Sequence, residues 1–401
     1  MARGRGGFIG QDGLNAPDSP TGVSASAGDA QATVSFTAPT DVGGSAITGF
    51  RAQSNTGVGA SGSSSPITVT GLTNGTSYTF NVWAINAFGY SAPSDASTGV
   101  SPVQFSRGLF AGGEWGPGGS SDTRNIIDYI TITSTGNATD FGDLDSTIYS
   151  LTGFSSSTRG VFAGGFDTSS SSGINRIQYV TIASTGNATD FGDLINTPQG
   201  PGGLSSSTRG VVGGGYVSSG SNVIQYVTIA STGNATDFGD LTVARWYLGA
   251  TSSPTRGLFA GGNSSNVTID YITIASTGNA TDFGDLVSGG GDGGQAGASN
   301  GTRAVFGGNA VPSNQIDYVT IASTGNASDF GNLTTSRGLG AGTSATGVDR
   351  AVFGGGGSGG VGQNTIDYVT VSTTGNATDF GDLTKACASL AACSSAHGGL
   401  Q

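Results

Sequence analysis

Short runs of alternating hydrophobic and polar residues recur along most of the chain. Residues 269–274 and 366–371 are two such runs, and stretches rich in Asn, Gly, Ser and Thr separate them. A period of two predicts β-strands, because successive side chains of a strand point to opposite faces of its sheet. The Gly- and Asn-rich stretches predict tight turns. We find no run with helical spacing, so the pattern predicts an all-β protein.

A repeated block organises the C-terminal three-quarters of the chain. The sequence Thr-Gly-Asn-Ala-Thr-Asp-Phe-Gly-Asp-Leu recurs with its Asn at positions 137, 187, 234, 279, 326 and 376, and its fifth copy carries Ser328 and Asn332. An apolar segment led by Arg precedes each copy, with the Arg at positions 107, 159, 209, 256, 303 and 350. The arginines are 47 to 52 residues apart, a period typical of stacked β-sheet arrays.

Each repeat contains four segments of strand length. In the fourth repeat we expect strands at residues 245–250, 257–260, 269–275 and 280–286. A single four-stranded sheet that is apolar on both faces cannot bury those faces alone. Six such sheets around an axis bury their faces against one another. The first repeat lacks a strand before residue 107, and the last has a surplus one at 386–393. We therefore expect the C-terminal strand to complete the first sheet.

Three features of the repeat resemble the kelch family. A Gly-Gly doublet ends the second strand, a Tyr follows at positions 129, 179, 226, 271, 318 and 368, and an aromatic residue follows that. The second aromatic is a Phe, at 141, 191, 238, 283, 330 and 380, where kelch repeats have Trp. The resemblance implies that residues 104–401 form a six-bladed kelch-like β-propeller.

Residues 17–103 have a different pattern. An alternating segment at 34–39 and a longer one at 72–86 predict strands of a β-sandwich. The segment 72–86 is similar to the signature of fibronectin type III domains, with Leu72 and Tyr78 at the positions of the tyrosine corner. Phe36 stands where that family usually has Trp. The fold class expected for the whole chain is thus all-β, with a fibronectin type III sandwich followed by the propeller.

Composition and charge exclude several classes of partner. Charged residues make up 10% of the chain, and its net charge is −12, which argues against a nucleic-acid partner because nothing would neutralise phosphates. No apolar run approaches the ~18 residues of a membrane span, and the N-terminus has no apolar signal segment. We therefore expect the protein to stay in the cytoplasm in which it is synthesised unless lysis releases it. Cys387 and Cys393, placed in one strand, would lie about 20 Å apart and stay unpaired.

Several motifs resemble those of catalytic or ligand-binding sites, but a structural role is the preferred interpretation of each. The repeated Asp-Phe-Gly lacks the lysine-bearing strand of a kinase, because Lys385 is the only Lys. The glycine string 354–360 lacks a phosphate-loop ending. The Asn-Ala-Thr copies are formal glycosylation sites, and tight turns are the preferred interpretation. Acid pairs such as Asp282 and Asp285 would give at best a weak Ca²⁺ site. With His397 as the only His, we predict no metal, no cofactor and no enzymatic activity.

Connections in an antiparallel four-stranded sheet divide between its two ends. The connections between strands 1 and 2 and between strands 3 and 4 lie at one end and vary little among the repeats. The 2–3 connections and the 4–1 connections between repeats lie at the other end and differ freely. Recognition residues are often placed on such loops, and aromatic side chains suit sugar or protein contacts. An alternative is that these aromatics pack only against neighbouring turns. The candidate ligand-binding residues are Trp115, Trp246, Tyr247, Tyr149, Phe166 and Tyr216.

Residues 1–16 combine charge with an apolar pair. Arg3 and Arg5 precede Phe8 and Ile9, and these four residues are the candidate assembly-docking residues; the alternative is a frayed terminus. Together with the two domains, this end resembles virion proteins of marine and cyanobacterial phages.

That resemblance implies a non-catalytic, tail-associated virion surface protein. Its N-terminal peptide would bind other virion proteins in a homo- or hetero-oligomeric assembly, and its propeller would bind a host-surface glycan or protein. The alternatives are a purely structural decoration or spacer subunit of a capsid, tail or filament, and an extracellular bacterial adhesin.

Overall fold

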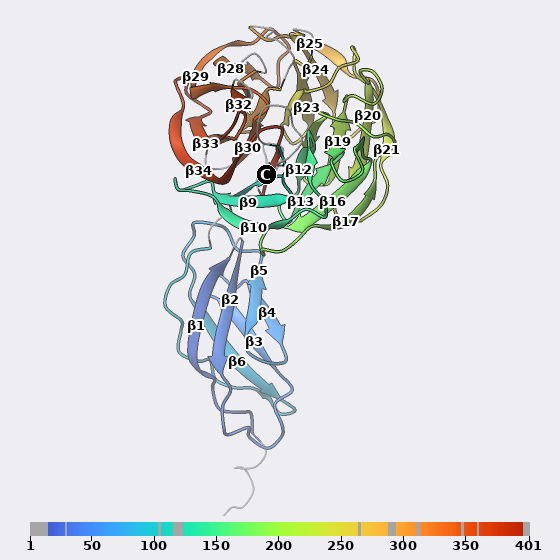
Figure 1. Ribbon diagram of the computed structural model, residues 1–401. Coiled ribbons are helices and arrows are strands. Elements are labelled where there is room, and N and C mark those ends of the chain that lie inside the picture. Colours follow the sequence, from blue (N-terminus) through green and yellow to red (C-terminus); the bar gives the residue numbers. More distant parts are fainter. Residues whose placement is uncertain are drawn as a thin grey trace, which may run out of the picture. The chain divides into compact units, whose positions relative to one another are not determined.

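The chain divides into two compact units, residues 1–105 and 106–401. The computed structural model describes residues 15–28, 30–102, 106–114, 123–263, 266–287, 294–309, 313–345, 349–358 and 361–395 (Figure 1). Every regular element among these residues is a β-strand, so the prediction of an all-β protein is confirmed. Across the same residues, no helix has the length and apolar character needed to cross a membrane.

The N-terminal unit contains two antiparallel sheets. The first has the order β1-β2-β5, with bounds Thr21–Gly28, Gln31–Thr37 and Ile67–Thr70. The second has the order β4-β3-β6-β7, with bounds Gly59–Gly62, Gly49–Ser54, Phe80–Asn86 and Gly89–Tyr90. Buried and more exposed residues alternate along β2, β3 and β6, as expected of strands with one face in a core.

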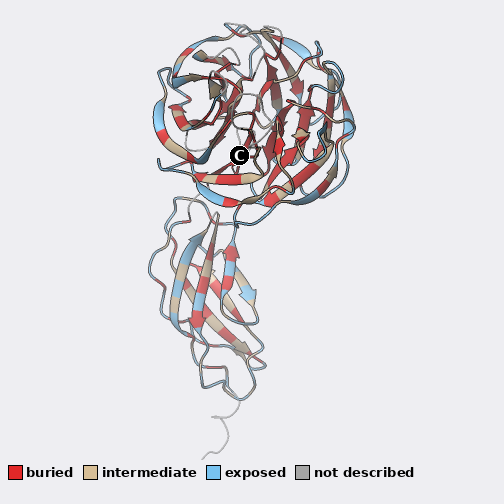
Figure 2. Ribbon diagram, in the orientation of Figure 1, coloured by how far each residue is buried: buried red, intermediate tan, exposed pale blue. Residues whose placement is uncertain are grey.

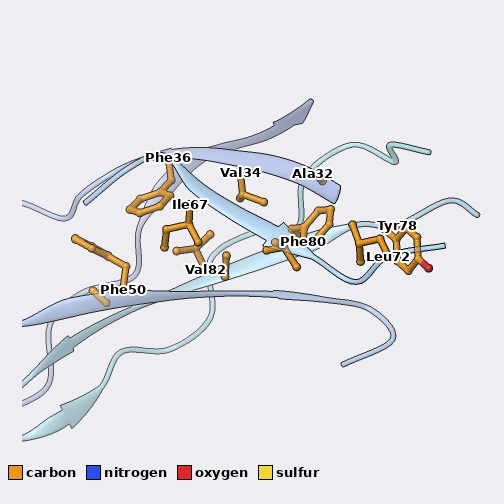
Figure 3. Close-up of a cluster of buried hydrophobic side chains, with 12 residues drawn as sticks. Ala32, Val34, Phe36, Phe50, Ile67, Leu72, Tyr78, Phe80 and Val82 are labelled. Carbon is orange, nitrogen blue, oxygen red and sulfur yellow. The ribbon is translucent and has the colours of Figure 1, made fainter. Parts of the chain in front are cut away.

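The two sheets enclose one hydrophobic core (Figure 3). Phe36 packs there against Phe50, with 4.8 Å between ring centroids. Leu72 and Tyr78 are also buried. The hydroxyl oxygen of Tyr78 accepts a hydrogen bond of 3.0 Å from the backbone N–H of Thr73. This is the hydrogen bond of a tyrosine corner.

Buried serines line the segment that follows β7. Ser91, Ser94 and Ser97 lie three residues apart, and each hydroxyl accepts a hydrogen bond of 2.9 to 3.0 Å from a backbone N–H of β6. Their own N–H groups donate to carbonyl oxygens of the same strand. A three-residue period is that of a polyproline II segment, so this segment covers the edge of β6 partly through its side chains.

The C-terminal unit contains six antiparallel sheets of four or five strands and one smaller sheet in its described residues (Figure 1). We number the sheets along the chain by the Arg that begins the second strand of each. The first strands, here called the inner strands, are β35 (Ala391–Ser394), β12 (Thr152–Ser155), β18 (Gly202–Ser205), β22 (Gly249–Ser252), β26 (Ala296–Ser299) and β30 (Ala341–Ala345). The second strands are β8 (Arg107–Ala111), β13 (Arg159–Ala163), β19 (Arg209–Gly213), β23 (Arg256–Ala260), β27 (Arg303–Gly307) and β31 (Arg350–Gly354).

The remaining strands complete each sheet. The third strands are β9 (Ile126–Thr131), β16 (Arg176–Thr181), β20 (Val223–Thr228), β24 (Thr268–Thr273), β28 (Ser313–Thr320) and β33 (Val361–Thr370). The fourth, or outer, strands are β10 (Thr139–Asp143), β17 (Thr189–Asp193), β21 (Thr236–Asp240), β25 (Thr281–Asp285), β29 (Ser328–Arg337) and β34 (Thr378–Cys387). A small sheet joins β11 (Ile148–Tyr149), β14 (Phe166–Asp167) and β15 (Ser172–Gly173), and β32 (Gly357–Ser358) pairs with β33. Figure 2 shows buried residues in the inner strands and exposed ones along the outer strands.

Two expected strands differ from the observed ones. Residues 245–250 were expected as an inner strand, but β22 begins at Gly249, because Tyr247 has a positive φ of 56° that interrupts an extended chain. Residues 386–393 were expected as one strand. They instead span the end of β34 and most of β35, with Ser389 at a φ of 58° between them. The two cysteines therefore lie in different strands, and both are buried and free.

Contacts between the sheets form a closed cycle. Each inner strand packs against the next, and β35 packs against both β30 and β12. The Arg that begins each second strand lies 4.2 to 4.5 Å from the Tyr ring of its own sheet. Its Nη1 donates a hydrogen bond of 2.8 to 3.0 Å to a carbonyl of the next sheet. In the sixth sheet this donor is Arg350, and its acceptor is Ile132 of the first sheet.

Candidate functional site

A ring of backbone hydrogen bonds precedes the inner strands. Each of six residues with φ between 53° and 89° donates its N–H to the carbonyl of the equivalent residue in the preceding sheet, at 2.6 to 2.8 Å. These ring residues are Ser150, Gly200, Tyr247, Gly294, Leu339 and Ser389. At the far ends of the inner strands, serine hydroxyls donate to carbonyls of neighbouring inner strands at 2.6 to 2.8 Å. All inner strands therefore run in the same direction.

This common direction sorts the connections onto two faces. The 2–3 connections and the 4–1 segments lie on the side of the backbone ring, which we call the loop face. The 1–2 and 3–4 turns lie on the opposite side, which we call the turn face. The varied and the uniform connections of the repeats thus occupy opposite faces.

Polar side chains of the turn face are used within the protein. The Asn of each Gly-Asn-Ala turn accepts a hydrogen bond of 3.0 to 3.1 Å from a backbone N–H of the neighbouring outer strand. Ser156 and its equivalents accept hydrogen bonds from the backbone of the 1–2 turns. The uniformity of these turns therefore has a structural cause, since each turn must fit the adjacent sheet.

Apolar side chains are exposed on the loop face. In the described part of the C-terminal unit, the large hydrophobic residues that are 38% to 54% exposed belong to the 2–3 and 4–1 connections, except for one at the first position of β33. They are Ile195, Tyr216, Val217, Val243, Val287 and Val361. These exposed apolar residues therefore distinguish the loop face from the turn face.

The predicted aromatic residues form two pairs on this face. Tyr149 of β11 lies beside Phe166 of β14, with ring centroids 5.2 Å apart. Tyr216 contacts Trp246 edge to face at 5.3 Å. Trp246 is half-buried and lies over Gly220, where an added Cβ would be 3.1 Å from the indole. Part of each aromatic surface thus packs against neighbouring loops, and part remains accessible.

The remaining predicted site residues divide into two groups. Tyr247 belongs to the backbone ring, and its side chain lies over Gly200. Trp115 lies outside the described residues, as do Arg3, Arg5, Phe8 and Ile9 of the predicted docking segment.

Gln199 was not predicted as a site residue, and the fold places it between two residues that were. Tyr149, Gln199 and Trp246 each directly precede a ring residue, in three consecutive sheets. Since the ring residues are hydrogen-bonded neighbours, these three residues lie in a row. Only an alignment of the repeats on their ring residues would have placed Gln199 there, because the loops themselves have no common pattern.

The charged groups near this row lie at its Tyr149 end. Arg176 forms an ion pair of 2.8 Å with Asp145. The carboxylate of Glu114 accepts a hydrogen bond from the Ser389 hydroxyl at 3.1 Å, and burial raises the pKa of Glu114. Burial, followed by the nearby charge of Glu114, raises the pKa of Tyr149. Tyr149 is therefore a neutral phenol at physiological pH.

Two ion pairs are buried beneath the loop face. Arg245 binds Asp270 at 3.0 Å, and Arg337 binds Asp367 at 2.9 Å. In the first sheet, Asp128 is the equivalent of these two aspartates. Cys387 is the equivalent of the two arginines. Burial raises the pKa of Cys387 to about 12, so this thiol is not a nucleophile at neutral pH. Among the described residues, no group of three His, Cys, Asp or Glu side chains is placed to hold a metal ion.

Comparison with known families decides the identity of the N-terminal unit. Residues 18–100 match the family model of the fibronectin type III domain. The N-terminal unit contains a fibronectin type III domain. Its two sheets, its tyrosine corner and its core agree with that family. No curated protein matches the chain.

The fibronectin type III domain exposes its own apolar residues near its first described residues. Val42, Phe88 and Tyr90 are 38%, 47% and 55% exposed. Asn86 holds this region together, because its Nδ2 donates to the carbonyl oxygens of Val42, at 2.9 Å, and of Asn15, at 3.0 Å. Asn15 and Val42 are therefore held close together by one side chain.

Proposed function

We propose that the C-terminal unit is a six-bladed kelch-like β-propeller, displayed on a non-catalytic, tail-associated virion protein for binding to the host surface. Three cyclic features support the propeller: the packed inner strands, the ring of backbone hydrogen bonds and the Arg-to-carbonyl hydrogen bonds between sheets. The Tyr and Phe of each repeat also meet edge to face, 5.9 to 6.1 Å apart.

The asymmetry between the two faces carries the proposal of recognition. The turn face uses its Asn and Ser side chains to join neighbouring sheets, whereas the loop face exposes apolar side chains on connections of different length. A rigid scaffold with varied, partly apolar loops on one face is the usual arrangement of a binding surface. The loop face is therefore the proposed contact with the host, through a surface glycan or protein.

The titratable side chains support a non-catalytic role. The repeated arginines stack on tyrosines and join adjacent sheets. Arg245 and Arg337 neutralise buried carboxylates. Cys387 and Cys393 are buried, and burial raises the pKa of both thiols. Each of these groups has a structural role that explains its presence without a reaction.

Attachment to the virion is assigned to residues 1–16. Arg3 and Arg5 would make charge contacts, and Phe8 and Ile9 would anchor the peptide in an apolar site of another virion protein. Deleting residues 2–10 should leave both units folded, because the described strands begin at Thr21, and should prevent incorporation into the particle. Electrophoresis of purified particles measures incorporation, and normal incorporation of the deletion variant would contradict this assignment.

Adsorption to host cells tests the recognition face. Replacing Tyr216 and Trp246 by Ala should reduce adsorption of the purified protein about tenfold or more, because aromatic anchors carry a large share of binding energy. Asn234→Ala on the turn face is the matched control, and it should lower stability and leave adsorption unchanged. If the control loses adsorption while folded and the aromatic variant keeps it, the wrong face has been assigned. If the unmodified protein adsorbs to no host cell, the chain is a structural spacer.

A further inference from the structure

Two rows of side chains cross the loop face over the second, third and fourth sheets. The inner row, next to the backbone ring, contains Tyr149, Gln199 and Trp246. Each member directly precedes a residue of the backbone ring, and the ring residues are hydrogen-bonded to one another. The N–H of Gly200 donates to the carbonyl of Ser150 at 2.7 Å, and the N–H of Tyr247 donates to the carbonyl of Gly200 at 2.6 Å.

The outer row comes from the 2–3 connections, and each member is paired with one of the inner row. Phe166 pairs with Tyr149 in the small sheet. Tyr216 exchanges two backbone hydrogen bonds with Gln199, at 2.8 and 2.9 Å. The N–H of Asn263 donates to the carbonyl of Trp246 at 2.9 Å. We call these two rows the aromatic–amide strip. Its backbone is fixed by strand-type pairing, so its side chains are held in place before any ligand binds.

The chemistry of the strip alternates along the inner row. Tyr149 and Trp246 present partly exposed aromatic rings, and Gln199 between them presents a carboxamide. This carboxamide forms no hydrogen bond with another described residue, and it is half-buried. A carboxamide both donates and accepts hydrogen bonds, which suits the vicinal hydroxyl groups of a sugar, while an aromatic face suits the apolar C–H face of the same ring.

The six members of the strip are uncharged, and the half-buried carboxylate of Glu114 lies near Tyr149 at one end of it. In residues 195–199, 216–222 and 242–247 the charged side chain is Arg245, which is fully buried and paired with Asp270. The ion pair of Arg176 and Asp145 flanks the strip and is internally neutralised. An anionic ligand would meet no cationic side chain among the members of the strip, and it would be repelled by Glu114 and by a chain of net charge −12.

From these observations we infer that the aromatic–amide strip binds a neutral, extended oligosaccharide. Aromatic rings stack on the sugar rings, and Gln199 hydrogen-bonds to hydroxyl groups between the two stacked positions. This inference rests on the proposed role of the loop face in host-surface binding, and it names the class of ligand. Gln199 is the residue that selects a hydroxylated ligand over a purely apolar one.

The test uses the full chain on an array of neutral, sialylated and sulfated oligosaccharides, followed by titration with the neutral ones that bind. Binding should be confined to neutral oligosaccharides. The Kd should change less than about twofold between about 50 mM and about 500 mM salt, because screening weakens only contacts between charges. Binding confined to acidic oligosaccharides, or a steep dependence on salt, would overturn the inference.

Variants of the strip are compared with a variant of the turn face. Gln199→Leu keeps the size of the side chain and removes its hydrogen bonds, so affinity should fall about fivefold or more at an unchanged Tm. Trp246→Ala should cost about tenfold or more. Asn234→Ala, on the turn face, is the control and should bind as the unmodified protein does. If Gln199→Leu binds normally, the carboxamide does not contact the ligand and the inference is wrong.

One outcome distinguishes this inference from the function on which it rests. If the protein adsorbs to host cells through Tyr216 and Trp246 but binds no oligosaccharide, the ligand is a protein. The neutral glycan is then excluded, and recognition by the loop face stands. If the protein adsorbs to no host cell and binds no oligosaccharide, both proposals fail.

Discussion

The side-chain oxygen of Asn137 accepts a hydrogen bond of 3.1 Å from the backbone N–H of Asp382, which follows 245 residues later in the chain. The bond joins the 3–4 turn of the first sheet to the outer strand of the sixth. Arg350 and Ile132 make a second link between the same two sheets. The first sheet also takes its inner strand, β35, from the C-terminal end of the chain. Closure of the cycle therefore depends on three separate kinds of contact.

Removing the C-terminal strand tests how much closure contributes to stability. Deleting residues 390–401 leaves β34 intact and removes β35, so β8 would present an unpaired edge and the packing of β12 and β30 would be lost. We expect aggregation or a large fall in Tm, measured by thermal unfolding and size-exclusion chromatography. A soluble variant that melts within a few degrees of the full chain would mean that this strand is dispensable.

A glycine of the repeat is required by a close approach between sheets. Gly381 has φ of +149°, and a Cβ built on it would lie 2.5 Å from the carbonyl oxygen of Gly136 in the neighbouring turn. Gly381→Ala should therefore destabilise the protein by about 3 kcal/mol, through backbone strain and steric overlap. Gly375→Ala is the control, because a Cβ there meets no atom within 4 Å. Equal unfolding free energies of the two variants in denaturant would contradict this account.

Periodicity explains why much of the fold could be predicted. The spacing of the Arg-led segments gave the six sheets, because a repeat that cannot bury its own faces must stack on its neighbours. The equivalence of the six arginines indicated a structural role, which their stacking on Tyr rings bears out. Leu72 and Tyr78 indicated the fibronectin type III domain for a similar reason, since a buried Tyr with a fixed hydrogen bond leaves a local signature.

Residues outside the repeat could not be placed in the same way. Arg245 was expected in an inner strand, but it precedes the interruption at Tyr247 and turns inward to Asp270. The contact between Tyr216 and Trp246 joins two connections of unrelated sequence. Gln199 belongs to no sequence motif, and its position beside Tyr149 and Trp246 follows from the backbone ring. Such positions follow from three-dimensional pairing of loops, and no local pattern in the chain encodes that pairing.

The serine segment of the fibronectin type III domain has a measurable role in stability. The Ser94 hydroxyl accepts a hydrogen bond of 2.9 Å from the buried N–H of Val82. Ser94→Ala leaves this donor without that acceptor, which should cost about 1 to 3 kcal/mol. Ser63→Ala, at an exposed position, should change stability by less than about 0.5 kcal/mol. Denaturant unfolding of the two variants makes the comparison, and equal effects would show that the serine hydroxyls are not required.

The buried carboxylates of the C-terminal unit should respond differently to the same substitution. Asp270→Asn leaves the guanidinium of Arg245 buried without its counter-ion, so we expect a loss of about 3 to 5 kcal/mol in unfolding free energy. Asp128→Asn removes a carboxylate that has no ion-pair partner among the described residues, and we expect a loss of about 1 kcal/mol, from weaker hydrogen bonds to Thr384. A larger loss of unfolding free energy in Asp128→Asn than in Asp270→Asn would contradict this difference between the two carboxylates.

The stability contributed by Asp128 should depend on pH. Burial raises the pKa of Asp128, and the nearby Asp140 acts in the same direction, against hydrogen bonds from Thr384 that lower it. The folded protein therefore takes up a proton on this carboxyl more readily than the unfolded chain. Its contribution to stability rises as the pH falls through the folded-state pKa, and it levels off below the unfolded value of about 3.9.

The Asp128→Asn variant tests this dependence, because it cannot bind this proton. Between about pH 7 and about pH 4, the change in unfolding free energy should thus be less favourable in the variant than in the unmodified protein. Parallel pH profiles of the two proteins would show that Asp128 titrates normally.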